Sequence, residues 1–244
     1  MEGYAMEVQA NVCSTRRVNG EAPVINRSLI KLLNPAPSFQ LIGIDAPARG
    51  KVKAFIADRF HQTHGAALRE FLPHLLTVEC RGHYCAALGI RPAGQGPLFL
   101  EHYLDSTAEQ AVAAHTRGPV SRQSIVEVGN LVSGRNGASA LIFLMLLSVV
   151  QKAGFHWVMF TGTPEVQRGI CKLGFVIESI GEARLEDLPG NHGDWGSYYE
   201  EGPQVVIGDV QASIASARQS RLMQTILTLF SAEIESMAAS LLAH

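Results

Sequence analysis

The chain has 244 residues, 47% of them hydrophobic, and a formal net charge of −2 at pH 7. This length allows one large globular domain with arms, and the near-zero charge argues against a general nucleic-acid-binding protein. The four cysteines lack the paired spacing of a zinc site, and so few scattered thiols are typical of a cytoplasmic protein. We therefore expect a cytoplasmic protein with no bound metal and no nucleic-acid partner.

The N-terminal part of the chain predicts an arm, a strand and a helix. Residues 1–27 are polar and show no hydrophobic periodicity, so we expect a flexible arm there. A first strand is predicted over residues 39–44. A helix is predicted over residues 53–76, because apolar side chains recur there at intervals of three and four residues.

The next segment has the pattern of antiparallel strands. Two apolar runs, residues 75–78 and 84–90, flank Arg81-Gly82-His83 and predict a β-hairpin. A further strand is predicted over residues 98–103. Ser106-Thr-Ala-Glu109 has the pattern of a capping box and predicts a short helix to about residue 114.

The segment from Ile125 to Phe175 carries the clearest functional pattern. A strand over residues 124–132 leads through the turn Ser133-Gly-Arg-Asn-Gly-Ala138 into a helix over residues 138–152 that is apolar on nearly all sides. The free N–H groups and the dipole at the start of a helix favour an anion, so this turn is a candidate pyrophosphate site. A strand over residues 157–161 and a short helix that ends near Gly174 complete the unit.

The C-terminal region predicts two strands and one long helix. The strands are expected over residues 175–180 and 204–207. We expect the helix to pack on its own domain or on a partner subunit, which would allow a homodimer, because its polar face has too few basic residues for a membrane surface. Its apolar residues are spaced by three and four: Met223, Ile226, Phe230, Ile234, Met237 and Leu241.

The order of these elements predicts an α/β fold with helices on both faces of a mixed sheet. Hairpin strands early in the chain and strand–helix–strand units later imply antiparallel strands first and parallel strands afterwards. The expected organisation is an arm over residues 1–27, one domain over 28–210 and a C-terminal amphipathic helical extension over 211–244.

The unit from Val126 to Phe175 resembles the GNAT acyltransferase superfamily. In that fold a central strand splays from its neighbour, the acyl-thioester arm of the donor lies in the gap, and the following turn binds pyrophosphate. The resemblance implies a GNAT-like splayed sheet and a donor that is acyl-CoA or an acylated acyl carrier protein, which would then be a partner. The positions it implies for donor binding are Val128, Asn130, Leu131, Val132, Arg135, Asn136, Gly137, Ala138 and Ser139.

A second resemblance covers most of the chain and points to the thermostable hemolysin family, which is itself similar to acyl-homoserine-lactone synthases. Arg59, Phe60, Arg91 and Glu127 occupy positions that these synthases use, whereas Asn130 stands where they have arginine. The resemblance therefore does not imply S-adenosylmethionine as a substrate. The strings that carry it are Arg59-Phe60, Gly89-Ile-Arg91, the run from Gly96 to Asp105, Glu127-Val-Gly-Asn-Leu131 and Trp195-Gly-Ser-Tyr-Tyr199.

Glu127 is the candidate general base. A carboxylate on a core strand costs free energy unless it is paired or used, and burial raises its pKa toward the range that suits a base. The alternative is that Glu127 faces solvent or a structural arginine such as Arg91. Many GNAT enzymes have a tyrosine acid near the positions of Ile170 and Cys171, so the acid here must lie elsewhere; Tyr198 and Tyr199 are the candidates, and Tyr199 is the favoured one.

The candidate substrate contacts are cationic and aromatic. Arg59, Arg91 and Arg122 could each bind a carboxylate in bidentate fashion or pair with a structural carboxylate. Glu101 and Tyr103 would share one face of a strand over residues 98–103. The aromatic residues near position 195 could line an acyl-chain site or cover the end of the sheet. The predicted substrate-binding residues are Arg59, Phe60, Arg91, Glu101, Tyr103 and Trp195.

These observations leave three functional classes. The favoured one is an acyltransferase that moves a fatty acyl group from a thioester to a small-molecule amine, with an amino acid as one candidate. The second is a membrane-lytic protein, as the family name states. The third is a non-catalytic module that binds acyl thioesters.

Overall fold

The computed structural model describes residues 29–31, 33–134, 137–190 and 192–243, and the arm predicted over residues 1–27 lies outside them. Within these residues, seven strands form one sheet in the order β1-β2-β3-β4-β5-β7-β6. The strands are β1 (Ser38–Ile42), β2 (His74–Cys80), β3 (His83–Pro92), β4 (Ile125–Ser133), β5 (Trp157–Gly162), β6 (Ile177–Glu182) and β7 (Gln204–Asp209).

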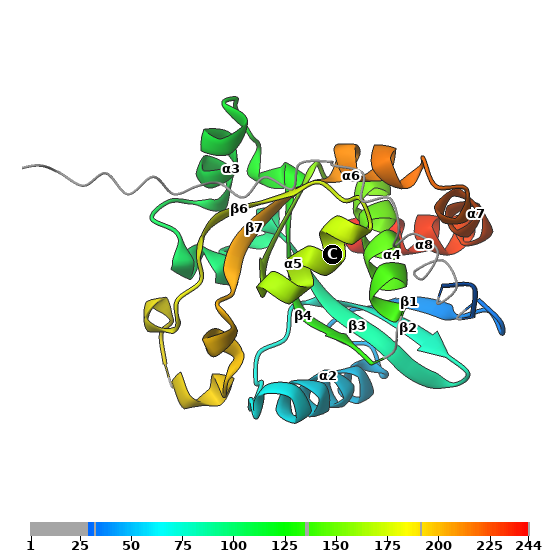
Figure 1. The fold of residues 1–244 in the computed structure, drawn as a ribbon, viewed down its shortest axis with the longest axis horizontal. Coiled ribbons are helices and arrows are strands. Elements are labelled where there is room, and N and C mark those ends of the chain that lie inside the picture. The colour runs from blue at the N-terminus through cyan, green and yellow to red at the C-terminus, as the bar shows by residue number, and fades with distance from the viewer. Residues whose placement is uncertain (1–28, 32, 135–136, 191, 244) are drawn as a thin grey trace, which may run out of the picture.

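Helices cover both faces of this sheet, which confirms the predicted α/β fold class. Figure 1 shows α2 on one side of the strands and α4 with the C-terminal helices on the other. The α-helices are α2 (Arg49–His64), α3 (Ala108–Thr116), α4 (Ala138–Lys152), α5 (Pro164–Lys172), α6 (Val210–Ala217), α7 (Arg221–Leu229) and α8 (Ser231–Leu242). Short 3-10 helices are η1 (Ala93–Gln95), η2 (Phe99–Tyr103), η3 (Arg122–Ser124), η4 (Leu185–Asp187), η5 (His192–Trp195) and η6 (Tyr198–Glu201).

Only one pair of neighbouring strands in this sheet is parallel. Strands β1 to β4 pair antiparallel in chain order, β4 and β5 pair parallel, and β7 then pairs antiparallel with both β5 and β6. The prediction of antiparallel strands first is confirmed, but the prediction of parallel strands afterwards is wrong beyond β4–β5. The reason is that β7 inserts between β5 and β6.

Strands β4 and β5 separate halfway along β4. Their pairing begins at Ile125 with Trp157 and ends at Val128 with Phe160, while β4 continues to Ser133. On its other edge β4 carries a bulge, because the register with β3 shifts there and Asn130 has a φ of 52°. A bulge increases the local twist of a strand. The second half of β4 therefore leaves β5, as the predicted splayed sheet requires.

Helix α4 is the centre of the largest hydrophobic core. Twelve of its residues are buried, between the sheet on one side and α6 and α8 on the other. The prediction that an all-round apolar helix must be covered on both faces is confirmed. Because α4 begins directly after the turn that follows β4, this packing fixes the position of the turn.

Three predicted elements differ from the structure. Helix α2 ends at His64 rather than near residue 76, because Gly65 adopts a left-handed C-cap with φ 67°. Residues 99–103 form a 3-10 helix instead of a strand, because the Glu101 side chain folds back to accept the Leu98 N–H at 2.8 Å. The capping box of α3 begins one residue later than predicted, at Thr107, with Gln110 as its partner.

The C-terminal region forms three helices rather than the predicted single helix. The Ser220 side chain caps α7, and the chain turns again at Phe230 before α8. The helices pack on α4, and Phe230 contacts Phe39 of β1 edge-on at 4.8 Å. Within the described ranges no single helix combines the length and apolar character needed to cross a membrane; α7 and α8 meet that test only together, bent by 67°.

Candidate functional site

A cavity of about 980 Å³ lies where β4 and β5 separate. Its walls come from the end of α2, residues 68–72, β4, β5, α4, α5 and the segment around residues 195–201. One part is polar and aromatic, around Glu127. Another part is apolar and lies among Phe143, Leu146, Leu147, Ile170, Leu173 and Phe175.

Glu127 of β4 lines this cavity although it is only 3% exposed. Its Oε1 accepts the Leu100 N–H at 2.8 Å, its Oε2 accepts the Phe99 N–H at 3.2 Å, and Arg91 Nη1 lies 3.7 Å from Oε2. Burial raises the pKa of Glu127, against the two backbone hydrogen bonds and the charge of Arg91, which lower it. The structure thus brings Glu127 and Arg91 together within the cavity wall.

Arg91 lies directly across from Glu127 on β3 and also lines the cavity. Its Nη1 donates to the Pro97 carbonyl at 3.2 Å, and its side chain is 30% exposed. Within the described residues only Nη1 has a polar partner, so the rest of the guanidinium fork is open to a carboxylate.

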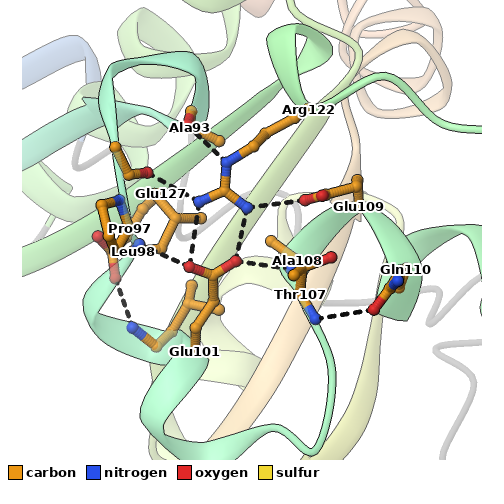
Figure 2. Close-up of polar contacts among 12 residues, drawn as sticks. Ala93, Pro97, Leu98, Glu101, Thr107, Ala108, Glu109, Gln110, Arg122 and Glu127 are labelled. Carbon is orange, nitrogen blue, oxygen red and sulfur yellow. Dashed lines mark hydrogen bonds and ion pairs between the residues drawn. The ribbon is translucent and has the colours of Figure 1, made fainter.

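Glu101 is not part of the cavity wall, and its expected alternation with Tyr103 on a strand is wrong. Figure 2 shows Arg122 between the carboxylates of Glu101 and Glu109. Glu101 also accepts backbone N–H groups from Leu98 and Ala108, both at 2.8 Å. Burial alone would raise the pKa of Glu101, but the bonds from Arg122 and the two amides lower it to about 2. Arg122 and Glu101 therefore hold η2, which carries the amides that bind Glu127.

An aromatic cluster forms one wall of the cavity. The hydroxyls of Tyr103 and Tyr199 are hydrogen-bonded, and Trp195 contacts the rings of Phe99 and Tyr199 at 5.8 and 5.6 Å. All of these residues line the cavity. Burial raises the pKa of Tyr199 to about 12 and that of Tyr103 further. Both tyrosines therefore keep their protons at neutral pH.

Arg59 and Phe60 of α2 also line the cavity, but Arg59 lies near the turn after β4. A Cβ on Gly134 would come within 2.4 Å of Arg59 Nη2. Phe60 contacts Tyr198 at 6.3 Å between ring centroids. Arg59 was predicted as a substrate ligand, and the structure places it beside the candidate pyrophosphate turn.

The turn itself is described in part. Ser133, Gly134, Gly137 and Ser139 line the cavity, Ala138 is fully buried, and Arg135 and Asn136 lie outside the described residues. The Gly134 N–H donates a hydrogen bond to the Cys85 carbonyl at 2.9 Å. Among the predicted donor positions on β4, Val128, Asn130, Leu131 and Val132 all line the cavity.

His64 and Glu201 are cavity residues that the sequence did not single out. His64 Nδ1 lies 3.3 Å from Glu201 Oε1, and both residues line the cavity. The sequence placed His64 in the interior of a longer helix, so nothing marked it as a helix end. Only the fold brings it to Glu201.

A family model described as "Thermostable hemolysin" matches residues 42–214. A search of curated protein sequences found no match. Among solved structures, TofI in a ternary complex with an inhibitor and MTA is 10% identical, with a TM-score of 0.50, over 74% of this chain and 95% of that chain. This likeness supports the fold.

Two further solved structures match with TM-scores of 0.49. FeeM, an N-acyl amino acid synthase from uncultured soil microbes, is 18% identical over 78% of this chain and 99% of that chain. The AHL synthase LasI is 12% identical over 74% of this chain and 95% of that chain.

Proposed function

The chain belongs to the thermostable hemolysin family, and we propose that it is an acyltransferase that moves an acyl group, in particular a fatty one, from an acyl thioester to an amine. The observation that carries this proposal is the separation of β4 from β5 after Val128, which opens into a cavity containing Glu127. The unpaired edge of β4 would bind the thioester donor, and the buried carboxylate of Glu127 beside it would accept a proton.

The donor in this proposal is acyl-CoA or an acylated acyl carrier protein. Beyond Val128, the β4 edge toward β5 pairs with no strand of the described part of the chain, so its backbone groups can pair with the amides of a pantetheine arm. The turn from Ser133 to Ser139, including Arg135 and Asn136, and the first N–H groups of α4 would hold phosphate. The apolar part of the cavity, around Phe143 and Leu146, suits an acyl chain.

The acceptor in this proposal is a small-molecule amine, and an amino acid fits best. The ammonium and carboxylate of an amino acid are close together, as are Glu127 and Arg91, which are 3.7 Å apart. Glu127 would bind the ammonium and Arg91 the carboxylate, with Phe60, Tyr103 and Trp195 as walls. Glu101 would support the site through η2 without touching the acceptor.

The chemistry needs a neutral amine, a held carbonyl and a proton for the leaving sulfur. Glu127 would take a proton from the ammonium, since its raised pKa brings it nearer to neutral pH. The backbone N–H of Gly129 or Asn130, at the bulge, would stabilise the oxyanion. Tyr199 would protonate the departing thiolate.

The test is to incubate the purified protein with palmitoyl-CoA and a mixture of common amino acids, and to search for N-acyl products by mass spectrometry. We expect an amide product and release of free CoA. Glu127→Gln should lower turnover by about 100-fold, as expected for loss of a general base, and leave the affinity for palmitoyl-CoA nearly unchanged. Binding of palmitoyl-CoA without any product would favour the acyl-thioester-binding module instead.

A further inference from the structure

His64 and Glu201 form a histidine–carboxylate pair in the same cavity as Glu127. His64 Nδ1 is buried and 3.3 Å from Glu201 Oε1, yet it has no hydrogen bond of good geometry within the described residues. The Glu201 side chain is 43% exposed, so a rotation can bring its carboxylate into line with Nδ1. A buried ring nitrogen needs such a partner.

The other ring nitrogen of His64, Nε2, makes no hydrogen bond within the described residues. Nδ1 is the one side-chain nitrogen or oxygen of the described residues that is both buried and without a hydrogen bond, so Nε2 is not enclosed in this way. Nε2 is therefore accessible, and the His64 ring lines the cavity. A carboxylate at Nδ1 fixes the proton there and leaves Nε2 as the acceptor nitrogen.

The His64 ring is held in place by aromatic neighbours. It contacts Tyr198 edge-on at 5.4 Å and Phe60 at 5.9 Å. His64 is the last residue of α2, directly before the Gly65 C-cap. Packing on the aromatic rings and the carboxylate of Glu201 thus fix where the ring lies in the cavity wall.

Acyl transfer from a thioester to an ammonium releases one net proton, because the leaving thiolate takes up only one of the two protons that the nitrogen loses. An ammonium must lose two protons to become an amide nitrogen, and Glu127 can hold only one of them. Glu127 is also almost fully enclosed, whereas Glu201 reaches solvent. The second proton therefore needs an acceptor with a path to water.

We propose that His64, positioned by Glu201, accepts the second proton from the attacking nitrogen and passes it to solvent. This inference rests on the proposed acyl transfer. As the C–N bond forms and the C–S bond breaks, Nε2 takes the proton that the positively charged nitrogen still carries. The thiolate takes its proton from Tyr199, and Glu127 returns its own proton to that tyrosine. The net products are the amide, the thiol and one proton released from His64 to water.

The test compares His64→Gln with His61→Gln, an exposed histidine one turn earlier on α2 that does not line the cavity. With palmitoyl-CoA and the amino acid mixture, His64→Gln should lower kcat by about 100-fold without changing KM for palmitoyl-CoA, and His61→Gln should change neither. Added imidazole should raise the turnover of His64→Gly by about tenfold, because it can replace the missing ring. It should not raise the turnover of Glu127→Gln.

Glu201 is tested as a positioning residue. The ¹⁵N spectrum of the wild-type protein should show His64 with its proton on Nδ1, and Glu201→Gln should shift the tautomer and lower kcat about tenfold. Glu201→Asp keeps the carboxylate, so its kcat should stay close to that of wild type. Glu200→Gln should change neither the tautomer nor kcat.

Undiminished turnover of His64→Gln, or a loss that imidazole does not relieve, would overturn the inference while leaving acyl transfer intact. A wild-type protein that forms no amide with any amine would instead remove the proposed function, and the role of His64 with it.

Discussion

Asn130 of β4 ties the bulge to the segment before β2, because its Oδ1 accepts the Leu72 N–H at 2.9 Å. Its Nδ2 donates to the Glu70 carbonyl at 3.1 Å. Asn130 also has a φ of 52°, a left-handed conformation that asparagine tolerates better than most residues. One side chain thus stabilises the backbone turn at which β4 leaves β5 and fixes a wall of the cavity.

We expect Asn130→Ala to destabilise the protein by about 2–3 kcal/mol, because the Leu72 N–H loses its acceptor and alanine is strained at this φ. Asn130→Asp keeps the acceptor oxygen and tolerates the left-handed conformation but loses the hydrogen bond to the Glu70 carbonyl, so its cost should be about 1 kcal/mol. Urea denaturation measures both values. Equal destabilisation by the two variants would contradict the importance of the Leu72 bond.

The Glu101–Arg122 pair predicts an acid-dependent stability difference. Its carboxylate has a pKa of about 2 in the folded protein against a usual value of 4.5, so its stabilisation is complete above the unfolded value and is lost as pH falls toward 2. After allowance for solvent screening, Glu101→Gln should cost about 2 kcal/mol at pH 7. The difference in unfolding free energy between wild type and Glu101→Gln, measured by urea denaturation, should become smaller between about pH 5 and pH 2. A gap that stays constant over this range would show that the ion pair does not supply it.

Local sequence was enough to predict the unit from β4 to α5. The continuous apolar run predicts α4 from Ala138 to Lys152, and the Thr163-Pro164 pair predicts the start of α5, where Thr163 accepts the Val166 N–H. These signals lie within a few residues of the structure they specify. The splay and its buried Glu127 followed from the resemblance that this unit supports.

Contacts between distant residues explain the parts that could not be predicted. Residues 98–103 have strand-like alternation, but Arg122, twenty-one positions beyond Glu101, holds that carboxylate where it favours a 3-10 helix. The insertion of β7 between β5 and β6 has no local signal either. The partnership of His64 with Glu201 is the same kind of case, since it exists only once the chain has folded.

Substitutions at and beside Arg59 test whether this residue binds the acyl donor or the amine acceptor. A Cβ at Gly134 would displace its guanidinium, so Gly134→Ala and Arg59→Ala should both raise KM for palmitoyl-CoA by about tenfold, the effect of losing one charge-assisted hydrogen bond. Arg135→Ala should act in the same direction. The KM for the amino acid acceptor should stay unchanged, as it should for the surface variant Arg184→Ala. A rise in the acceptor KM alone would return Arg59 to the role of carboxylate ligand that its sequence position first indicated.

Gly196 controls how the segment with Trp195 and Tyr199 rests on α2. It has a φ of 53°, and a Cβ there would lie 1.9 Å from the His64 carbonyl oxygen, a backbone atom that cannot move aside cheaply. That same oxygen accepts the Ser197 N–H at 2.9 Å, so a Gly196→Ala variant should lose this contact and displace the aromatic wall. We expect a loss of about 2–4 kcal/mol in unfolding free energy and a fall in turnover of about tenfold or more.

Gly202→Ala is the matched control, because its φ of 63° imposes the same left-handed strain while its Cβ would meet open space. It should cost about 1–2 kcal/mol and leave turnover nearly unchanged. Thermal unfolding and CoA release measure the two effects, and equal losses in the two variants would show that backbone strain, rather than contact with α2, accounts for both.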